Sequence, residues 1–147
     1  MFELLKKLFP ICRSITGNGV RKTLSIIKEI IPINMYEIPS GTKVFDWTIP
    51  KEWNIYDAYI KDEKGQRIID FKKSNLHVVN YSSPISGEFS LSELKKNIYT
   101  IPKQPDLIPY ITSYYKERWG FCMSQKQLDA LKEANYKVKI DSKLERG

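Results

Sequence analysis

The apolar positions in the first third of the chain recur with the period of a helix. This spacing predicts a short amphipathic helix over residues 1–9 and a longer one over residues 20–31. The glycine-containing segment 13–19 predicts a turn between them, in which Thr16 or Asn18 is a candidate cap for the second helix. Because the second helix carries a wide apolar stripe, we expect that face to pack against a larger body.

After residue 40 the pattern changes to short runs of apolar, β-branched and aromatic residues. These runs predict strands over residues 43–49, 53–62, 67–71, 76–81 and 136–141, with a further candidate over 110–115. The polar segment 62–65 ends in glycine, so it predicts a hairpin turn between the second and third of these strands.

Two capping boxes mark the starts of helices in the second half of the chain. Ser90 and Glu93 form the first, which predicts a helix to about residue 99, and Ser124 and Gln127 form the second, which predicts a helix to about residue 134. In each box the side chain of one residue binds the backbone amide of the other, so that two otherwise unpaired amides are satisfied.

The order of these elements is typical of an α+β fold. Helices come first, a β-rich section follows with two short helices, and a final strand ends the pattern. That final strand has no strand next to it in the sequence. It could return to the earlier sheet or be the first strand of a further domain, and the pattern leaves both pairings open.

Length and composition are those of a globular protein. The chain has 147 residues, enough for one domain or for one domain and part of another, with 41% hydrophobic and 28% charged residues. No apolar run approaches the roughly 18 residues that a membrane span requires, so we expect no membrane partner. Residues 1–7 hold an acid and two lysines where a signal peptide has its apolar stretch, so we expect a cytoplasmic protein.

The net charge of +7 suggests nucleic acid, but the distribution of charge argues against it. Residues 1–39 carry 6 basic and 3 acidic side chains, residues 40–102 carry 9 and 8, and residues 103–147 carry 9 and 6. The excess is therefore spread along the chain, and lysines outnumber arginines by 19 to 5, whereas base recognition favours arginine. We expect no nucleic-acid partner.

Few residues are suited to metal binding or covalent catalysis. Cys12 and Cys122 are the only cysteines and are far apart in the sequence, and His77 is the only histidine. Zinc sites draw on several such residues at short spacing, so we expect no metal site and no catalytic residue in this chain.

The densest group of aromatic residues lies over residues 110–122, with one arginine among them. Rings with polar tips next to a guanidinium suit a recognition surface, but the same rings could instead form the core of a small domain. On a strand over 76–81, His77 and Tyr81 would share a face, where they could bind a ligand or move a proton. A structural histidine satisfied by a neighbour is the alternative.

Six segments of the chain together resemble one bacterial protein family. They are, in order, Arg13–Gly17, Pro39–Trp47, Ile49–Trp53, Leu76–Ser82, Ile108–Tyr115 and Trp119–Cys122. The family consists of aminopeptidase-like proteins named as a domain of unknown function and related to the co-catalytic zinc aminopeptidases. The resemblance implies that residues 1–38 are the opening helices of an α/β core, residues 39–131 an inserted β-rich domain, and residues 132–147 the return to the core sheet.

The resemblance also implies where the metal lies in full-length members. Their ligands, a histidine and several aspartates or glutamates, lie beyond the position of Gly147, so this chain resembles the N-terminal third and no ligand can be carried over to it. We therefore expect it to be inactive alone. In full-length relatives we expect zinc-assisted cleavage of a peptide or amide substrate. The missing C-terminal part is then a possible partner of this chain.

The resemblance places the inserted domain beside the hydrolase site, where clefts form preferentially. We therefore expect a substrate-binding group on it. Its members are His77, Tyr81, Tyr114, Tyr115, Arg118 and Trp119. The alternative function, from a different class, is a stand-alone module that binds a peptide or a glycan through the aromatic cluster at 110–122.

Overall fold

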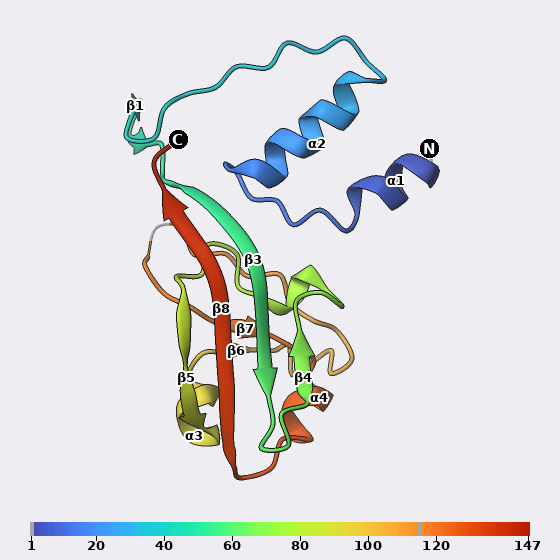
Figure 1. Ribbon diagram of the computed structural model, residues 1–147, viewed down its shortest axis with the longest axis vertical. Coiled ribbons are helices and arrows are strands. Elements are labelled where there is room, and N and C mark those ends of the chain that lie inside the picture. The colour runs from blue at the N-terminus through green and yellow to red at the C-terminus, as the bar shows by residue number, and fades with distance from the viewer. Residues whose placement is uncertain (1, 115) are drawn as a thin grey trace. The chain divides into compact units, whose positions relative to one another are not determined.

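The computed structural model describes residues 2–114 and 116–147, which divide into two compact units. Residues 1–54 and 143–147 make up the N-terminal unit, and residues 55–142 make up the sheet unit. Figure 1 shows helices and several small sheets, so the predicted α+β class is confirmed. The domain limits implied by the family resemblance concern a longer protein and stay predictions.

The N-terminal unit begins with two helices, as predicted. Helix α1 spans Phe2–Leu8 and α2 spans Asn18–Lys28. The prediction of one strand over 43–49 is wrong, because the chain reverses there in a hairpin of β1 (Lys43–Val44) and β2 (Trp47–Thr48). The reversal passes through Phe45, whose φ of 54° is incompatible with a continuous strand.

The start of α2 depends on a residue far along the chain. Gly17 occupies the N-cap position with φ 102°, and a Cβ there would lie 2.6 Å from the carbonyl oxygen of Trp53, so only glycine fits. The Asn54 side chain accepts a hydrogen bond from the Asn18 amide at 2.8 Å. Neither Thr16 nor Asn18 therefore caps the helix, since the cap comes from strand β3.

The sheet unit is built on four strands in the order β4-β3-β8-β5. They are β3 (Glu52–Lys61), β4 (Arg67–Asp70), β5 (Ile85–Ser90) and β8 (Asn135–Glu145), and the β3–β4 hairpin is as predicted. The final strand does not stand alone. It lies between β3 and β5 (Figure 1), and its first six residues pair antiparallel with β5, so it returns to the earlier sheet.

Both capping boxes are present and open short helices. Helix α3 spans Leu91–Lys95 and α4 spans Gln125–Asp129, each shorter than predicted. Strands β6 (Ile98–Tyr99) and β7 (Phe121–Cys122) form a small parallel pair.

The predicted strand over 76–81 is wrong. Residues 75–77 form the 3₁₀ turn η1 (Asn75–His77), and beyond it only single bridges from Val78 to Phe121 and from Asn80 to Thr112 are present among the described residues. Over 110–114 and 116–119 the described backbone likewise forms no strand beyond the bridge at Thr112. His77 and Tyr81 therefore do not share one face of a strand.

The two units differ in how much apolar surface they bury. Trp53 is the single buried large hydrophobic residue among the described part of the N-terminal unit. The sheet unit holds the main core, made of Ala58, Ile60, Ile69, Val78, Val79, Tyr81, Leu91, Leu94, Phe121, Cys122, Met123, Tyr136, Val138 and Ile140. Among the described residues, no helix has both the length and the apolar character needed to cross a membrane.

Candidate functional site

Arg118 anchors the loop that carries the aromatic cluster. Its guanidinium donates hydrogen bonds to the Ser113 hydroxyl at 2.9 Å, the Thr112 carbonyl at 2.8 Å and the Tyr99 hydroxyl at 3.3 Å. The same group lies 5.5 Å from the centre of the Tyr99 ring. All three acceptors are neutral, and among residues 2–114 and 116–147 no carboxylate pairs with Arg118. The site thus holds a positive charge and two further N–H donors.

The predicted rings divide into two groups. Tyr81 and Tyr114 meet edge to face at 5.1 Å between ring centres, and the Tyr114 hydroxyl lies 3.4 Å from that of the exposed Tyr110. Trp119 instead packs on Phe89, with ring centres 5.2 Å apart. Tyr115 lies outside the described residues. Tyr81 therefore contacts Tyr114, which lies in the same loop as Arg118. Trp119 instead contacts Phe89 of strand β5.

His77 is held in the core of the sheet unit. The side chain is buried, and its Nδ1 lies 2.9 Å from the carbonyl oxygen of Cys122. Burial lowers the pKa of His77 below its usual value, and the hydrogen bond to Cys122 opposes that effect only in part. The neutral ring donates from Nδ1 to this carbonyl and so ties η1 to strand β7.

Cys122 is not placed for nucleophilic catalysis. Burial raises the pKa of its thiol to about 11, so the thiol stays protonated at neutral pH. His77 contacts the backbone carbonyl of Cys122, and that contact leaves the imidazole Nδ1 unable to act as a base toward the thiol.

The backbone beneath the loop is fixed at Gly120. A Cβ at this position would lie 2.9 Å from the Asn97 carbonyl oxygen and 2.9 Å from the Tyr99 ring, so a side chain has no room. The Gly120 amide donates to the Ser82 hydroxyl at 3.2 Å, and Ser82 in turn donates to the Val79 carbonyl at 2.6 Å. This close packing fixes the position of the backbone at the C-terminal end of the 110–119 loop.

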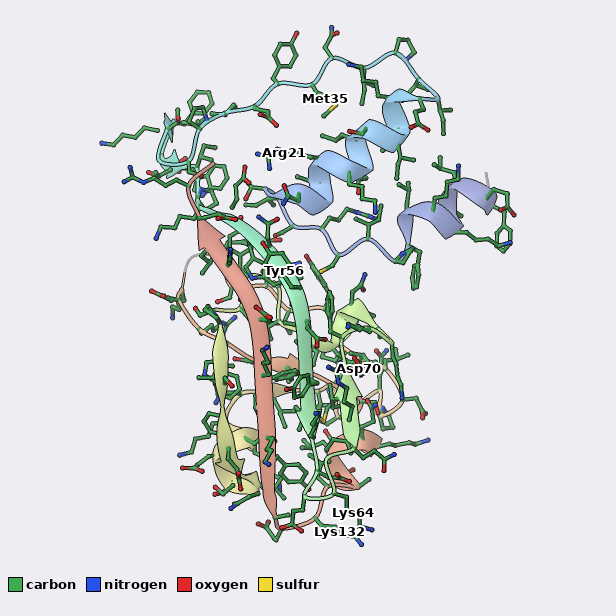
Figure 2. The ribbon with its side chains drawn as sticks, viewed as in Figure 1. Arg21, Met35, Tyr56, Lys64, Asp70 and Lys132 are labelled. Atoms are coloured by element: carbon green, nitrogen blue, oxygen red, sulfur yellow. The ribbon has the colours of Figure 1, made fainter. Side chains whose placement is uncertain are left out.

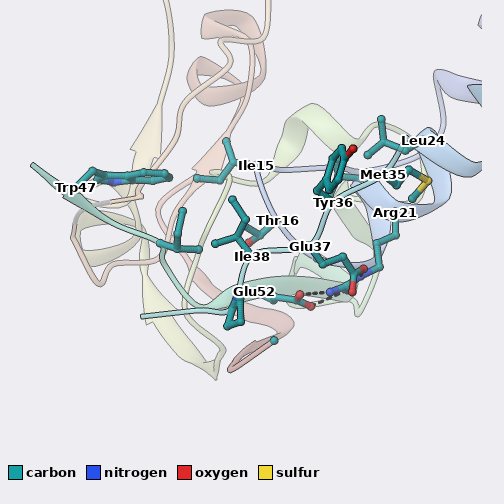
Figure 3. Close-up of a pocket in the computed structure, with 15 residues that line it drawn as sticks. Ile15, Thr16, Arg21, Leu24, Met35, Tyr36, Glu37, Ile38, Trp47 and Glu52 are labelled. Atoms are coloured by element: carbon teal, nitrogen blue, oxygen red, sulfur yellow. Dashed lines mark hydrogen bonds and ion pairs between the residues drawn. The ribbon is translucent and has the colours of Figure 1, made fainter. Parts of the chain in front are cut away.

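A second candidate site is a cavity of about 510 Å³ within the N-terminal unit. Residues of α2, among them Leu24, line one part of it, and the extended segment 35–39 lines another (Figure 3). Its lining residues are Ile15, Thr16, Gly17, Val20, Arg21, Leu24, Met35, Tyr36, Glu37, Ile38, Pro39, Trp47, Ile49, Glu52 and Gly147. Most of these are apolar, so the cavity suits an apolar occupant.

One edge of this cavity is charged. Arg21 donates to Glu37 at 2.7 Å and holds both carboxylate oxygens of Glu52, one of them at 2.8 Å (Figure 3). These bonds raise the pKa of Arg21 above its usual value, with the bond to Glu52 the largest cause. The sequence pattern singles out the apolar stripe of α2 but not Arg21, because its two acidic partners lie 16 and 31 positions away.

A smaller cavity of about 290 Å³ lies in the sheet unit at the β3–β4 turn. Lys64 and Lys132 lie near one another there (Figure 2), and Asp62 and Glu63 contribute acidic groups. Tyr136 closes the cavity, with its hydroxyl bonded to the backbone of Lys132. The signs of charge are mixed, so this cavity favours no particular ligand.

The described residues do not fit a zinc ion. Over residues 2–114 and 116–147, no three histidine, cysteine, aspartate or glutamate side chains come together as ligands would. The one histidine is buried and its Nδ1 is bonded to a backbone carbonyl.

Comparison with known proteins identifies the family to which this chain belongs. Residues 52–143 match the model of a family described as "Domain of unknown function (DUF2172)". The chain belongs to this family. The DUF2172 match covers β3, β4, β5, the 110–119 loop and most of β8, so it coincides closely with the sheet unit.

A longer curated protein and a longer solved structure match nearly the whole of the DUF2172 chain. A Clostridium acetobutylicum protein named "Putative polysaccharide biosynthesis protein with aminopeptidase-like domain" is 57% identical over 147 residues, which are 100% of this chain and 34% of that protein. A crystal structure of a "putative peptidase" from Clostridium acetobutylicum has a TM-score of 0.96 at 57% identity, with 99% of this chain and 35% of that one covered. The chain thus spans about a third of the length of the relatives it matches. The predicted resemblance to aminopeptidase-like proteins is confirmed.

Proposed function

We propose that this DUF2172 chain forms the substrate-recognition portion of an aminopeptidase-like metallopeptidase. The likeness to the Clostridium proteins supports the proposal, since 57% identity extends along the whole chain and one relative is named a peptidase. The metal, which we propose to be zinc, is held by residues that this chain does not contain. The function of the chain is then to bind and orient a peptide or amide substrate.

The 110–119 loop is the part of the chain that best suits this role. Arg118 pairs with no carboxylate among the described residues and has spare N–H donors, which suit a carboxylate or carbonyl oxygen of a substrate. The exposed Tyr110 ring, bonded to Tyr114, offers an apolar face with a polar tip. Tyr81 supports this loop through its ring contact with Tyr114, whereas His77 is bonded to the Cys122 carbonyl in the core.

Hydrolysis of aminoacyl anilides tests the proposal. We expect the full-length Clostridium relative to hydrolyse such substrates and to lose that activity on chelation of its metal, and we expect the present chain to show none. Chelation-sensitive hydrolysis by the present chain alone would contradict the proposal. So would a folded, zinc-loaded Clostridium relative that hydrolyses no aminoacyl substrate.

A glycan-binding role is the second candidate. The name of the Clostridium relative includes polysaccharide biosynthesis, and aromatic rings with hydroxyl groups suit the faces of sugars as well as peptides. Binding of soluble oligosaccharides to the isolated chain, lost on Tyr110→Ala, would favour this function over the first one.

A further inference from the structure

The four-stranded sheet ends in two edge strands, β4 and β5, that differ in how they are protected (Figure 1). Strand β4 has four residues, a register shift against β3, and ion pairs from Arg67 to Asp57 and Asp70. Short length, irregular register and charge are the features by which proteins prevent pairing at a sheet edge. Strand β5 instead has six residues in unbroken register with β8, and Glu88 is its one charged residue. The edge at β5 therefore lacks the protection that β4 has.

Two residues of β5 direct their backbone groups away from the sheet. The Leu91 amide donates to the Ala134 carbonyl, in the same register as the pairs between β5 and β8. Because bonded and non-bonded pairs alternate along an antiparallel ladder, Gly87 bonds to β8, whereas Ser86 and Glu88 do not. Both are exposed, and neither has a hydrogen-bond partner within residues 2–114 and 116–147. Two backbone donors and two backbone acceptors therefore face solvent along this edge.

An apolar surface lies next to this edge on the inner face of the sheet. Phe89 lies opposite the buried Tyr136 of β8, so its ring is on the same face of the sheet as the core. The ring leans over Gly87, where a Cβ would lie only 3.2 Å from it, and it packs on Trp119. Both rings are half-buried, so each keeps part of its surface accessible. A strand added to β5 would place every second side chain on the face that carries these two rings.

The edge adjoins the loop that carries Arg118. The Arg118 carbonyl accepts a hydrogen bond at 2.9 Å from the amide of Ser83, which lies two residues before the start of β5. Trp119, which packs on Phe89 of β5, follows Arg118 directly in the sequence. The 110–119 loop and the edge of β5 are therefore neighbours within the sheet unit, and one extended ligand can contact both.

We propose that the edge of β5 binds an extended peptide as a fifth strand of the sheet. The proposal rests on the proposed function only in taking that peptide to be the substrate. The backbone of Ser86 and Glu88 pairs with the peptide in an antiparallel ladder, which is the more stable arrangement per residue. Alternate side chains of the peptide contact Phe89 and Trp119. The substrate class is then a peptide of several residues, recognised mainly through its backbone, with apolar residues at every second position.

A peptide fits this edge better than a second copy of the chain. In a symmetric pairing of two β5 strands about Gly87, each Glu88 would lie diagonally across from Glu88 of the other copy, a separation of about 7–8 Å in such ladders. Like charges at that position disfavour the pairing, and a peptide need not carry an acid there. A glycan is a poorer fit, because it has no backbone that continues a β-ladder.

Peptide binding to the present chain tests this edge without any hydrolysis. The probe is Val-Thr-Val-Lys-Val-Thr with a fluorophore at its C-terminus, and fluorescence anisotropy measures its affinity. Ser86→Pro removes an outward amide and puts a ring in its place, whereas Ser86→Ala keeps the backbone and serves as the matched control. We expect Ser86→Pro to weaken binding at least tenfold and Ser86→Ala to change it by less than twofold. Equal affinities of the two variants would overturn the proposal.

N-methylated probes test the same edge with the protein unchanged. In an antiparallel ladder, the peptide residues that bond to Ser86 and Glu88 have their side chains on the polar outer face, so they are the threonines and the lysine. Methylation of those amides should abolish binding, and methylation of the two internal valine amides should preserve it. Equal binding of the two methylated probes would overturn the proposal, even if Ser86→Pro does not fold.

The outcomes separate this proposal from the peptidase activity. No binding of the probe by the folded chain would overturn the peptide site at β5 and leave the proposed hydrolysis untouched. Absence of hydrolysis by the Clostridium relative would leave the binding result unchanged. Self-association of the chain that Ser86→Pro abolishes would also overturn the proposal, because a second copy would then occupy the edge.

Discussion

In the sheet unit the large apolar side chains lie inside, whereas in the N-terminal unit the same residue types face outward. Phe121 is fully buried between the strands of the sheet unit, and Phe9 of the N-terminal unit is 79% exposed. The sheet unit also coincides with the DUF2172 match. This difference indicates that the sheet unit carries the main core, whereas the described part of the N-terminal unit buries few large apolar side chains.

The largest expected effect comes from the same substitution made in each unit. Phe121→Ala removes a fully buried ring, so we expect it to lower the free energy of unfolding by about 3–5 kcal/mol. Phe9→Ala removes an exposed ring, and we expect a change within about 0.5 kcal/mol. Urea unfolding of the present chain followed by tryptophan fluorescence measures both, and similar losses would remove the contrast between the units.

A smaller effect is expected for arginine substitutions. Arg118→Ala removes three hydrogen bonds, two within the 110–119 loop and one to Tyr99 of β6, so we expect a loss of about 1–3 kcal/mol in the free energy of unfolding. Arg146→Ala changes an exposed arginine of the N-terminal unit and serves as the matched control, with an expected change within about 0.5 kcal/mol.

In a chimera in which this chain replaces the matched third of the Clostridium relative, Arg118→Ala also separates two roles for this residue. We expect a raised KM for aminoacyl anilides in addition to the lost stability, because the guanidinium holds the loop and, in the proposed function, also binds substrate. A loss of stability with unchanged KM and kcat would make Arg118 a structural residue only.

The smallest expected effect is a dependence of stability on pH that arises in the sheet unit. Burial lowers the pKa of His77 in the folded state, so below the unfolded pKa near 6.5 the unfolded chain binds a proton that the folded chain does not. Stability should therefore fall as the pH decreases from about 7.5 to 5.5, by at most about 1.4 kcal/mol per pH unit. Asp57, whose pKa is lowered by its hydrogen bond to Arg67, contributes only at more acidic pH.

His77→Asn provides the control for this pH dependence. Its amide can still donate to the Cys122 carbonyl but does not titrate, so the slope between pH 7.5 and 5.5 should largely disappear. An unchanged slope in the variant would assign the acid sensitivity to another group.

Local signals allowed much of the fold to be predicted from the sequence. The capping boxes at Ser90 and Ser124 place the starts of α3 and α4 correctly, because each box is complete within four residues. The β3–β4 hairpin and the two N-terminal helices depend on similarly local patterns. The class of fold follows from these elements.

The errors occur where distant pairing decides the structure. The pattern predicts no strand over residues 85–90, which include Gly87 and few β-branched residues, yet this segment pairs with residues of β8 that lie 45 to 55 positions away. The hydrophobic run at 76–81 predicts a strand, but the His77 bond to Cys122 fixes a 3₁₀ turn instead. The contacts of Arg118 and the partners of Arg21 likewise join residues that no local pattern connects.

Amide hydrogen exchange of the present chain tests the contrast between the two units most directly. Exchange rates report the free energy of local opening, which is high in a packed core and low where few apolar contacts hold a segment. We predict that amides of β8 over residues 136–140 exchange at least a hundredfold more slowly than those of α2 over residues 22–28, after correction for intrinsic rates. Equal protection of the two segments would contradict the conclusion that the sheet unit, and not the N-terminal unit, holds the main packed core of this chain.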